Sequence, residues 1–569
     1  MINQLAERTI ARILGIGSAF VAVLVITGTV TDPVNVTKLV ALGGLAAGSF
    51  AVLLAFGARD LWMYSKSLVV VSGLLVATGI NTIVNSNGPL VQNIYGVYGR
   101  NTAFVTYILL IFVILAAAVL RARSSFTILI WGLLGAGFIN VVYCLWVVFF
   151  GDFIPWSNPY GNILGTFGNP NFIGAFLGLF AACLVAYSAK NGVQLKYRLG
   201  AGVVFLAAVY EIIESHAIQG RVVVAAGLGI VGFYLVRSKF KNVVAQIGYV
   251  VVIAVGGLFA LLGALQIGPL TKYIYKTSVS LRGEYWQAGW NMGTSHPFTG
   301  VGFDTYGDWY RRARDTQALV LPGPNTVTNA AHNVPFDVFA FGGWPLFISY
   351  IALLILTVIA IVKVTIRARA YDGVFVTLTT AWLCYQLQSV ISINQIGLAI
   401  WGWLFGGALI AYEISTRPAK NSDEGSKSPA NKGRRVVRQK QSETIFSSTM
   451  VAGVGAVVGL LIACPPYSAD AKWRSALSSQ NAQKLEEALV PGYLNPQNSY
   501  KYANAVQLME NSKLYDLAYK YAQISVQFNP DNFDSWKMFY FISKSSAAEK
   551  ATALENMKRL DPNNPNVLG

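Results

Sequence analysis

Long apolar stretches alternate with short polar connections along most of the chain, and this pattern predicts membrane-spanning helices. About thirteen apolar windows are long enough to cross a hydrocarbon core of about 30 Å. They cover residues 9–30, 38–57, 67–84, 102–120, 126–150, 172–188, 199–213, 221–236, 243–265, 343–362, 374–393, 396–412 and 446–464. We therefore expect an all-α, polytopic membrane protein with about twelve core transmembrane helices and one further span.

Composition agrees with this class. The chain is 54% hydrophobic and only 12% charged, with a mean hydropathy of +0.49, which excludes an ordinary soluble domain. The first window is long enough to span and lacks a convincing cleavage site, so it is interpreted as a membrane helix rather than a secretion signal. The four cysteines lie in or beside apolar segments without paired spacing, which indicates neither a disulfide framework nor a metal site.

Lysine and arginine accumulate in every second connection, which predicts the orientation because short cytoplasmic loops retain positive charge. The connections concerned carry Arg8 and Arg12, Arg59 and Lys66, Arg121 and Arg123, Lys190 with Lys196 and Arg198, Arg237 with Lys239 and Lys241, and Lys363 with Arg367 and Arg369. We expect a multi-pass protein of the cytoplasmic (inner) membrane with a cytoplasmic N-terminus. The net charge of +17 then owes much to topology, and no nucleic-acid partner is expected.

Four regions follow from this organisation: a membrane core at 1–415 with a large outer loop at about 267–333, a basic cytoplasmic linker at 416–445, a final transmembrane helix at 446–464, and an extracytoplasmic domain at 465–569. The last region contains "NPQN" at Asn495 and "NPDN" at Asn529, and "DPNNP" at Asp561 restarts the pattern. The offset of about 34 residues is the tetratricopeptide period. We expect a small helical repeat domain, which serves either as a plain cap or as a docking surface for a protein partner.

Three basic positions fall on the predicted outer face. Arg282 lies in the large loop that ends at His332, Arg221 follows the connection "ESHAIQG", and Arg100 ends "NIYGVYGR". Arginine presents a planar fork of donors that matches phosphate oxygens, and several of them at a lipid–water boundary suit a phosphate-bearing lipid. Histidine, with an unperturbed pKa of about 6.5, suits a general base that acts on a hydroxyl. The alternative is that these side chains only snorkel toward headgroups or bond to helix ends.

Other polar residues on this face are candidates for either a structural or a functional role. Asn169 and Asn171 in "GTFGNPNF", His296 before Pro297, and Asn333 after His332 are candidates for positioning a glycan or a loop. Asn-Pro also starts turns, which favours a structural role for the first pair. The glycines of "FTGVGFDTY" predict a tight turn, and "FGGWP" predicts a break between a short outer helix and a membrane span.

Three ordered segments carry a resemblance to a known family. "GTFGNPNFIGAFL", "SLRGEYWQAGWNMGTSHPFTGVGFDTY" and "AHNVPFDVFAFGGWPLF" resemble the O-antigen ligase/polymerase family of membrane glycosyltransferases, over roughly residues 70–400. The resemblance implies that Arg282 contacts the diphosphate of a polyprenyl-diphosphate-linked glycan and that His332 activates the acceptor hydroxyl. Arg221 falls where family members often carry an essential arginine, and Arg100 is a further candidate contact with the diphosphate.

The reaction implied by this resemblance moves the anomeric carbon of the glycan from a diphosphate oxygen to an acceptor hydroxyl of the cell envelope. Arg282 and Arg221 would stabilise the charge that develops on the diphosphate, so neither a metal nor another cofactor is expected. The acceptor distinguishes a ligase from a polysaccharide polymerase or a protein O-oligosaccharyltransferase. A transporter of lipid-linked glycan and a non-enzymatic scaffold remain alternatives from other classes.

Overall fold

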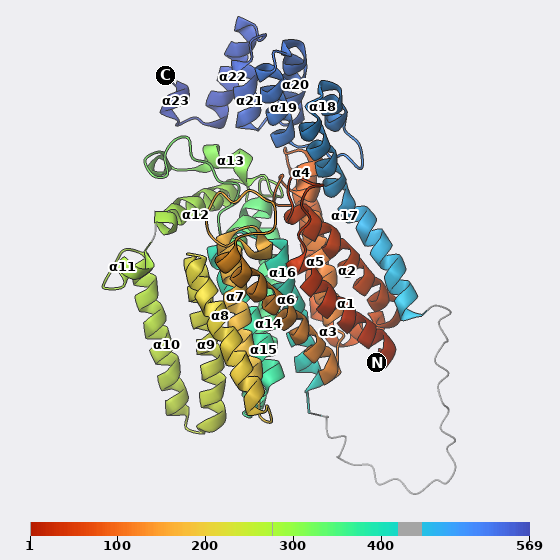
Figure 1. Ribbon diagram of the computed structural model, residues 1–569, viewed down its shortest axis with the longest axis vertical. Helices are drawn as coiled ribbons and strands as arrows, with labels where there is room; N and C mark the ends of the chain where they lie inside the picture. The colour runs from red at the N-terminus through yellow and green to blue at the C-terminus, as the bar shows by residue number, and fades with distance from the viewer. Residues whose placement is uncertain (1, 276, 419–446, 569) are drawn as a thin grey trace.

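The computed structural model describes residues 2–275, 277–418 and 447–568. Over these ranges the chain forms α-helices α1 to α23 and two short 3₁₀ helices, with no strand, which confirms the expected all-α class. Long helices form one layer, and α18 to α23 stand above it at one end (Figure 1). Helices α12 (Thr277–Ser295) and α13 (Tyr306–Ala313) lie between the two parts.

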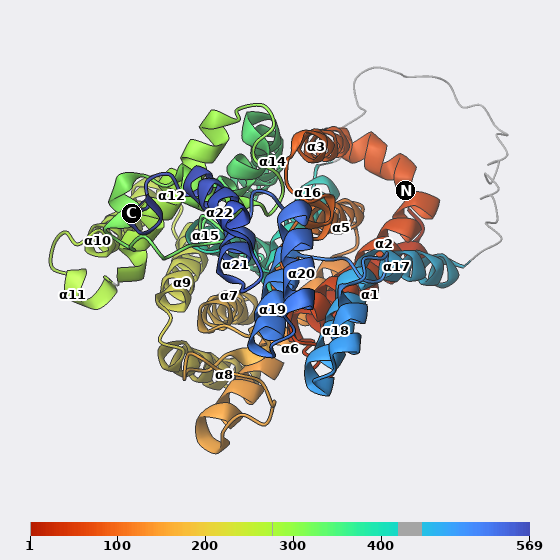
Figure 2. The same cartoon turned by 90° about the horizontal axis from the view of Figure 1, so that it is seen from above.

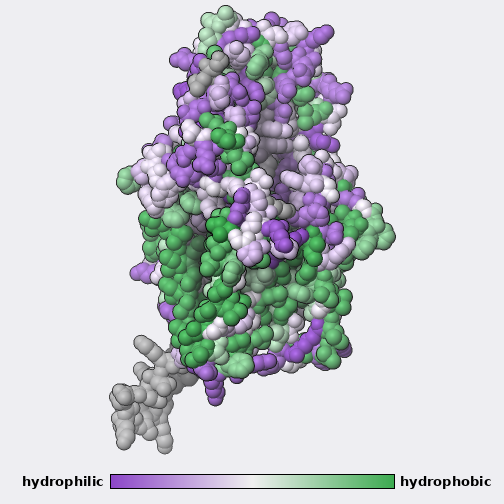
Figure 3. All heavy atoms as spheres, turned by 90° about the vertical axis from the view of Figure 1, so that its left-hand side faces the viewer, coloured by the Kyte–Doolittle hydropathy of each residue, from purple (hydrophilic) through white to green (hydrophobic). Residues whose placement is uncertain are grey.

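Ten helices of the described ranges are long and apolar enough to cross a membrane. They are α2 (Asn35–Phe56), α3 (Ala58–Asn85), α6 (Arg123–Phe150), α7 (Pro170–Ser188), α9 (Ile218–Lys239), α10 (Val243–Ala264), α14 (Val334–Arg367), α15 (Gly373–Ile391), α16 (Ile396–Ser415) and α17 (Ser448–Ser479). On the face seen in Figure 3, apolar side chains cover most of this layer, and polar side chains gather above it. The protein is therefore a multi-pass membrane protein.

Three of the thirteen predicted spans do not meet the same requirements of length and composition. Helix α5 (Phe104–Ala117) has 14 residues, about 21 Å at about 1.5 Å per residue, which is too short for a span. It is nevertheless enclosed, since most of its residues are buried. Helices α1 (Gln4–Val23) and α8 (Leu195–Glu214) carry more charges than a spanning window allows, among them Glu7 and Arg8 in α1.

Close backbone contact joins the first and last membrane helices of the sequence. A Cβ atom added to Gly43 of α2 would lie 2.5 Å from the carbonyl oxygen of Gly459 in α17. Small residues permit such an approach, and packing of this kind drives helix association in lipid. Helix α17 continues to Ser479, beyond the predicted end at residue 464, through Pro465 and Pro466. It therefore runs without interruption from the membrane layer into the C-terminal part.

Helix α14 contains the predicted break, at Gly342 and Gly343. The N–H of Val301 donates to the carbonyl of Ala340 at 2.9 Å, and that of Gly302 donates to the carbonyl of Phe341 at 3.0 Å. These carbonyls lack their helical donors, because the N–H of Trp344 bonds to Pro297 instead and Pro345 has no N–H.

The turn that fills this break is formed by the glycines of "FTGVGFDTY". Gly300 and Gly302 have φ angles of 62° and 113°, which side chains rarely adopt. A Cβ atom at Gly300 would lie 2.1 Å from the carbonyl oxygen of Phe341. Both sequence predictions, the tight turn and the helix break, are therefore confirmed, and together they attach the outer loop to the membrane helix that follows His332.

The C-terminal part consists of α18 (Ala482–Leu489), α19 (Ser499–Asn511), α20 (Tyr515–Phe528), α21 (Phe533–Phe541), α22 (Ala547–Leu560) and α23 (Pro565–Leu568). Asn498 and Asn532 cap α19 and α21, so each of these helices starts at a repeated Asn-Pro segment. The tetratricopeptide assignment stays a prediction. Of the predicted linker 416–445, residues 419–445 lie outside the described residues.

Buried ion pairs join the C-terminal part to the outer loop. The carboxylate of Asp561 accepts from Arg311 at 3.0 Å and from Arg314 at 2.7 Å, and its side chain is fully buried. Asp308 of α13 accepts from the side-chain amides of Asn529 at 3.2 Å and Asn532 at 2.8 Å. These bonds place the domain directly against the loop, and seen from above α19 to α22 lie over the membrane layer (Figure 2).

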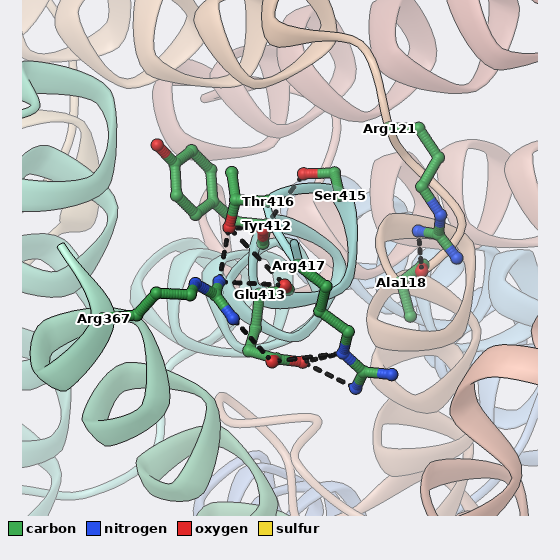
Figure 4. A network of polar contacts seen from close by, with 8 residues as sticks. All are labelled: Ala118, Arg121, Arg367, Tyr412, Glu413, Ser415, Thr416 and Arg417. Atoms are coloured by element: carbon green, nitrogen blue, oxygen red, sulfur yellow. Dashed lines mark hydrogen bonds and ion pairs between the residues drawn. The ribbon is translucent and has the colours of Figure 1, made fainter. Parts of the chain in front are cut away.

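At the opposite end of the membrane layer, basic side chains are held by local partners (Figure 4). Arg367, the last residue of α14, lies 3.2 Å from Glu413 and donates to the hydroxyl of Thr416 at 2.6 Å. Arg417 pairs with the same glutamate at 2.7 Å. Arg121 donates to the carbonyl of Ala118 at 2.8 Å. Arg367 and Arg121 belong to connections that the charge pattern predicts to be cytoplasmic, and the orientation itself stays a prediction.

Candidate functional site

The candidate base, His332, faces the helix that carries Arg282. The imidazole lies against the ring of Tyr285 in α12, with 5.5 Å between the ring centroids and 29° between the planes. Arg282 precedes Tyr285 by three residues, so the two side chains lie on one face of α12. Two segments that are fifty residues apart in the sequence are therefore brought together.

The backbone around His332 is fixed by the start of α14. His332 has a φ angle of 56°, a left-handed conformation that is uncommon for residues other than glycine. The N–H of Ala331 donates to Asp337 Oδ1 at 2.7 Å, and Asn333 Oδ1 accepts from the N–H of Phe336 at 3.1 Å. Bonds on both sides of His332 thus hold its imidazole in one place at the helix N-terminus.

Glu284 lies two residues after Arg282 and is the nearest carboxylate along the chain. No hydrogen bond or ion pair of its guanidinium occurs within the described ranges, and the conceivable pair with Glu284 is not formed. Burial lowers the pKa of Arg282. A partly desolvated cation without a partner is costly, so the site has an unmet electrostatic requirement for an anion.

Arg100 belongs to the same cluster and comes from the connection between α4 (Leu90–Tyr95) and α5. Asp304 Oδ2 accepts from the N–H of Val97 at 2.9 Å and ties this connection to the outer loop. Burial raises the pKa of Asp304 to about 6, while the positive charge of Arg100 acts in the opposite direction. Asp470 of α17 accepts from the hydroxyl of Tyr98 at 2.8 Å. The position of Arg100 thus depends on the outer loop and on the last membrane helix.

Burial, together with these two arginines, alters the protonation of His332. Desolvation, followed by the positive charges of Arg100 and Arg282, lowers the pKa of His332 to about 3. The imidazole is therefore neutral near pH 7, as a proton acceptor must be. The ordinary pKa of histidine does not hold for His332, because burial and neighbouring charges are properties of the folded protein. An anion bound between the arginines would offset their charge and raise the pKa of His332.

Arg221 is not joined to this cluster. It lies in the first turn of α9 with an exposed side chain, and no contact with His332, Arg282 or Arg100 occurs among the described residues. Its charge is not among those that shift the pKa of His332. The structure therefore brings together three of the four predicted residues.

The remaining candidates make local structural contacts. Asn169 caps α7 by accepting from the N–H of Asn171 at 2.9 Å, and the side chain of Asn171 is exposed. His296 packs on Trp309, with 4.8 Å between ring centroids, and its Nδ1 lies 3.0 Å from Ser295 Oγ. With the helix cap formed by Asn333, these contacts fit loop positioning.

Sequence reasoning missed three residues that shape the cluster. Tyr285 packs on His332, Asp304 holds the connection of Arg100, and Asp337 holds the backbone before His332. Both carboxylates are buried, with 2% and 4% of Asp304 and Asp337 exposed. Acidic residues within largely apolar segments are the available signal, since a buried carboxylate needs donors. Within the described ranges, no group of three or more His, Cys, Asp or Glu side chains is placed to hold a metal ion, and metal independence stays an expectation.

The fold and this cluster define a class: a multi-pass membrane protein with arginines and a neutral histidine gathered under an outer loop. Comparison with protein families adds that residues 171–351 match the family model described as O-antigen ligase. This segment includes Arg221, Arg282 and His332 but not Arg100, and it supports the family that the sequence resembles. The rest of the resemblance, over roughly residues 70–170 and 352–400, stays a prediction. A search of curated proteins found no match.

Proposed function

We propose that the protein transfers a polyprenyl-diphosphate-linked glycan to an acceptor hydroxyl at the outer face of the cytoplasmic membrane. One observation carries the proposal: a neutral His332 lies beside Arg282 and Arg100, neither of which forms an ion pair in the described part of the chain. The O-antigen ligase match over residues 171–351 supports a glycosyltransferase of this kind. The N-terminus and the linker 416–445 are then cytoplasmic, and the C-terminal domain is outside.

The proposed donor site uses arginine to hold the diphosphate. Arg282 and Arg100 converge on His332 from α12 and from the connection before α5, so an anion between them satisfies both guanidinium groups. Arg221 is the third proposed donor contact, because its exposed side chain is able to reorient toward a lipid headgroup. Fixed cations at the leaving group stabilise the transition state as negative charge develops there.

His332 is the proposed base. It accepts the proton of the acceptor hydroxyl while that oxygen bonds to the anomeric carbon of the glycan and the bond from that carbon to the diphosphate oxygen breaks. The polyprenyl diphosphate leaves with the bonding electrons. Binding of the diphosphate raises the pKa of His332 by offsetting the charges of Arg100 and Arg282, so the base becomes effective only when the donor is present.

Ligase, polymerase and protein O-oligosaccharyltransferase share this chemistry and differ in the acceptor. We favour a ligase, since the family match bears that description. A transporter of lipid-linked glycan is the non-enzymatic alternative, because unpaired arginines would also attract a diphosphate during translocation.

The decisive experiment uses the purified full-length protein, a fluorescent polyprenyl-diphosphate glycan and a panel of envelope acceptors, with products resolved by mass. His332→Ala should reduce transfer about 10²–10⁴-fold while donor binding persists. His216→Ala is the matched control, because His216 is also a left-handed residue, exposed and outside the cluster. Equal rates for wild type and His332→Ala would refute the proposed base. If the protein moved the donor across the bilayer of reconstituted vesicles without any glycan transfer, it would be a transporter and not a transferase.

A further inference from the structure

A groove of about 650 Å³ lies between the outer loop and the C-terminal domain. Its size is within the range of about 300–1,000 Å³ that small-molecule sites occupy. Asn291 of α12, Trp309 and Arg312 of α13, Asp315 and Gln317 of the following segment, and Asn563 after α22 line it. We call it the loop–domain groove. None of its residues belongs to the cluster around His332.

The lining combines hydrogen-bonding groups with an aromatic wall. No hydrogen bond of the side-chain amides of Gln317 and Asn563 occurs in the parts of the chain that the structure describes, and both residues are exposed. Asp315 accepts from Asn291 through Oδ1 at 2.9 Å, which leaves its second oxygen toward the groove or solvent. Amides and a carboxylate supply both donors and acceptors, as the neighbouring hydroxyl groups of a sugar require.

Arg312 and Trp309 form the more rigid side of the groove. The guanidinium carbon of Arg312 lies 3.8 Å from the centre of the Trp309 ring, and one of its nitrogens pairs with Asp531 at 3.3 Å. Nε and Nη2 of Arg312 have no partner among the described residues. These two nitrogens are buried, so the groups that a ligand reaches are the exposed amides of Gln317 and Asn563. A lipid chain would leave those amides unsatisfied, and the carboxylate of Asp315 disfavours a simple anion. Carbohydrate is the ligand class that fits the whole set.

The groove lies along the path that a glycan would take from the donor site. Arg282 and Asn291 are nine residues apart on α12, which corresponds to about 14 Å at about 1.5 Å per residue. His296, a sequence candidate for positioning a glycan, follows Ser295 at the groove and packs on Trp309. A glycan that leaves the diphosphate at Arg282 and follows α12 reaches the groove with sugars that are not adjacent to the breaking bond.

We propose that the loop–domain groove binds distal sugar residues of the donor glycan and so selects donors by glycan length. This inference rests on the proposed function and adds a second subsite to it. The C-terminal domain contributes Asn563, and the ion pairs of Asp561 with Arg311 and Arg314 hold this wall against the loop. The domain is therefore part of the substrate site.

The test compares two donors, one with a single sugar on the polyprenyl diphosphate and one with several repeat units. Gln317→Trp fills the groove and Asn563→Ala removes an amide, and both positions are exposed, so folding should persist. Each variant should raise KM for the long donor about tenfold and leave KM and kcat for the single-sugar donor unchanged. Gln507→Trp, at an exposed position of α19, is the matched control.

A binding measurement separates this inference from the proposed function. The oligosaccharide of the long donor, freed of lipid and diphosphate, is titrated into full-length protein by calorimetry, and binding should be weakened by Gln317→Trp but not by Gln507→Trp. If wild type transfers no glycan but this binding is observed, the proposed function fails and the groove stands as a carbohydrate site. Unchanged binding and unchanged KM in Gln317→Trp would overturn the proposal that the groove binds sugars. Weakened binding with unchanged donor KM would overturn its assignment to the donor.

Discussion

Arginines at the two ends of the membrane layer differ in what neutralises them. At the end away from the C-terminal domain, Arg367 and Arg417 share Glu413, and Arg123 pairs with Asp372 at 2.8 Å. Near the domain, Arg282 and Arg100 form no salt bridge with a carboxylate in the described ranges, although the charge of Arg100 acts on Asp304 from a greater distance. The first group is satisfied within the protein and has a structural role. The second group forms no such salt bridges, so its donors are available to an anionic ligand.

A third group of arginines lies between these extremes. Arg311 and Arg314 also belong to the outer loop that ends at His332, but both are paired with Asp561. Proximity to the outer face therefore does not define a ligand-binding arginine. The presence or absence of a salt bridge to a carboxylate distinguishes structural from ligand-binding arginines. Each of the three groups can be tested on this basis.

The largest effect on stability is expected for Asp561→Ala. The substitution leaves Arg311 and Arg314 buried without a counterion, and breaking a buried pair in this way costs about 3–5 kcal/mol. The C-terminal domain should separate from the loop, with a lower Tm and faster proteolysis near α13. Asp516→Ala is the matched control, since Asp516 forms a pair with Lys544 in which its own side chain is 89% exposed. Equal Tm values for the two variants would contradict the structural role of the Asp561 pairs.

Arg282→Ala should reduce activity strongly without lowering stability, whereas Asp561→Ala mainly lowers stability. Transfer should fall about 10²–10³-fold because a charge that stabilises the leaving diphosphate is lost. The Tm should not fall and should rise slightly, since an unpaired, desolvated cation is removed. Arg282→Lys should recover only part of the activity, because an ammonium group lacks the planar fork. Arg123→Ala serves as the control that keeps full transfer, and a parallel fall of Tm and activity in Arg282→Ala would assign Arg282 to the structural group.

The helices and their breaks could be predicted wherever a local stretch of sequence determines the structure. Each predicted window overlaps a helix, although 9–30 extends past the end of α1, and the break of α14 at Gly342 follows from a local Gly-Gly-Trp-Pro pattern. The end of α17 could not be predicted, because Pro465 and Pro466 normally end a helix. The helix continues to Ser479, where Asp470 and Trp473 are buried against segments remote in the sequence.

The candidate site also divides into features that local sequence predicts and features that depend on contacts between remote segments. Residue type identified His332, Arg282 and Arg100, since histidine and arginine at a membrane surface are chemically informative. Their convergence depends on contacts such as Asp304 with Val97, which lie more than two hundred residues apart. The separation of Arg221 from the cluster and the lowered pKa of His332 also follow from three-dimensional burial, which no local pattern encodes.

The pH dependence of stability offers a more moderate test of the cluster. The folded-state pKa of His332, about 3, lies below the unfolded value, which is about 6.5. The unfolded state therefore binds more protons between these values, so the stability contributed by the neutral imidazole is complete above about pH 6.5 and declines as pH falls toward 3. His332→Gln should lose this component of the pH dependence in chemical unfolding experiments. Identical pH profiles for the two proteins would show that His332 is not buried as neutral imidazole.

The smallest effect is expected for Arg417→Ala, and it completes the comparison of the two ends. The side chain of Arg417 is 49% exposed, and Glu413 keeps Arg367 as a second partner. Loss of a surface ion pair costs about 0–1 kcal/mol, so the free energy of unfolding should change little. Transfer should be unchanged, because Arg367, which shares Glu413 with Arg417, ends α14, whereas His332 precedes the start of this helix. If Arg417→Ala reduced transfer as strongly as Arg282→Ala, pairing with a carboxylate would not distinguish structural from ligand-binding arginines, and the argument that assigns the donor site to the unpaired ones would fail.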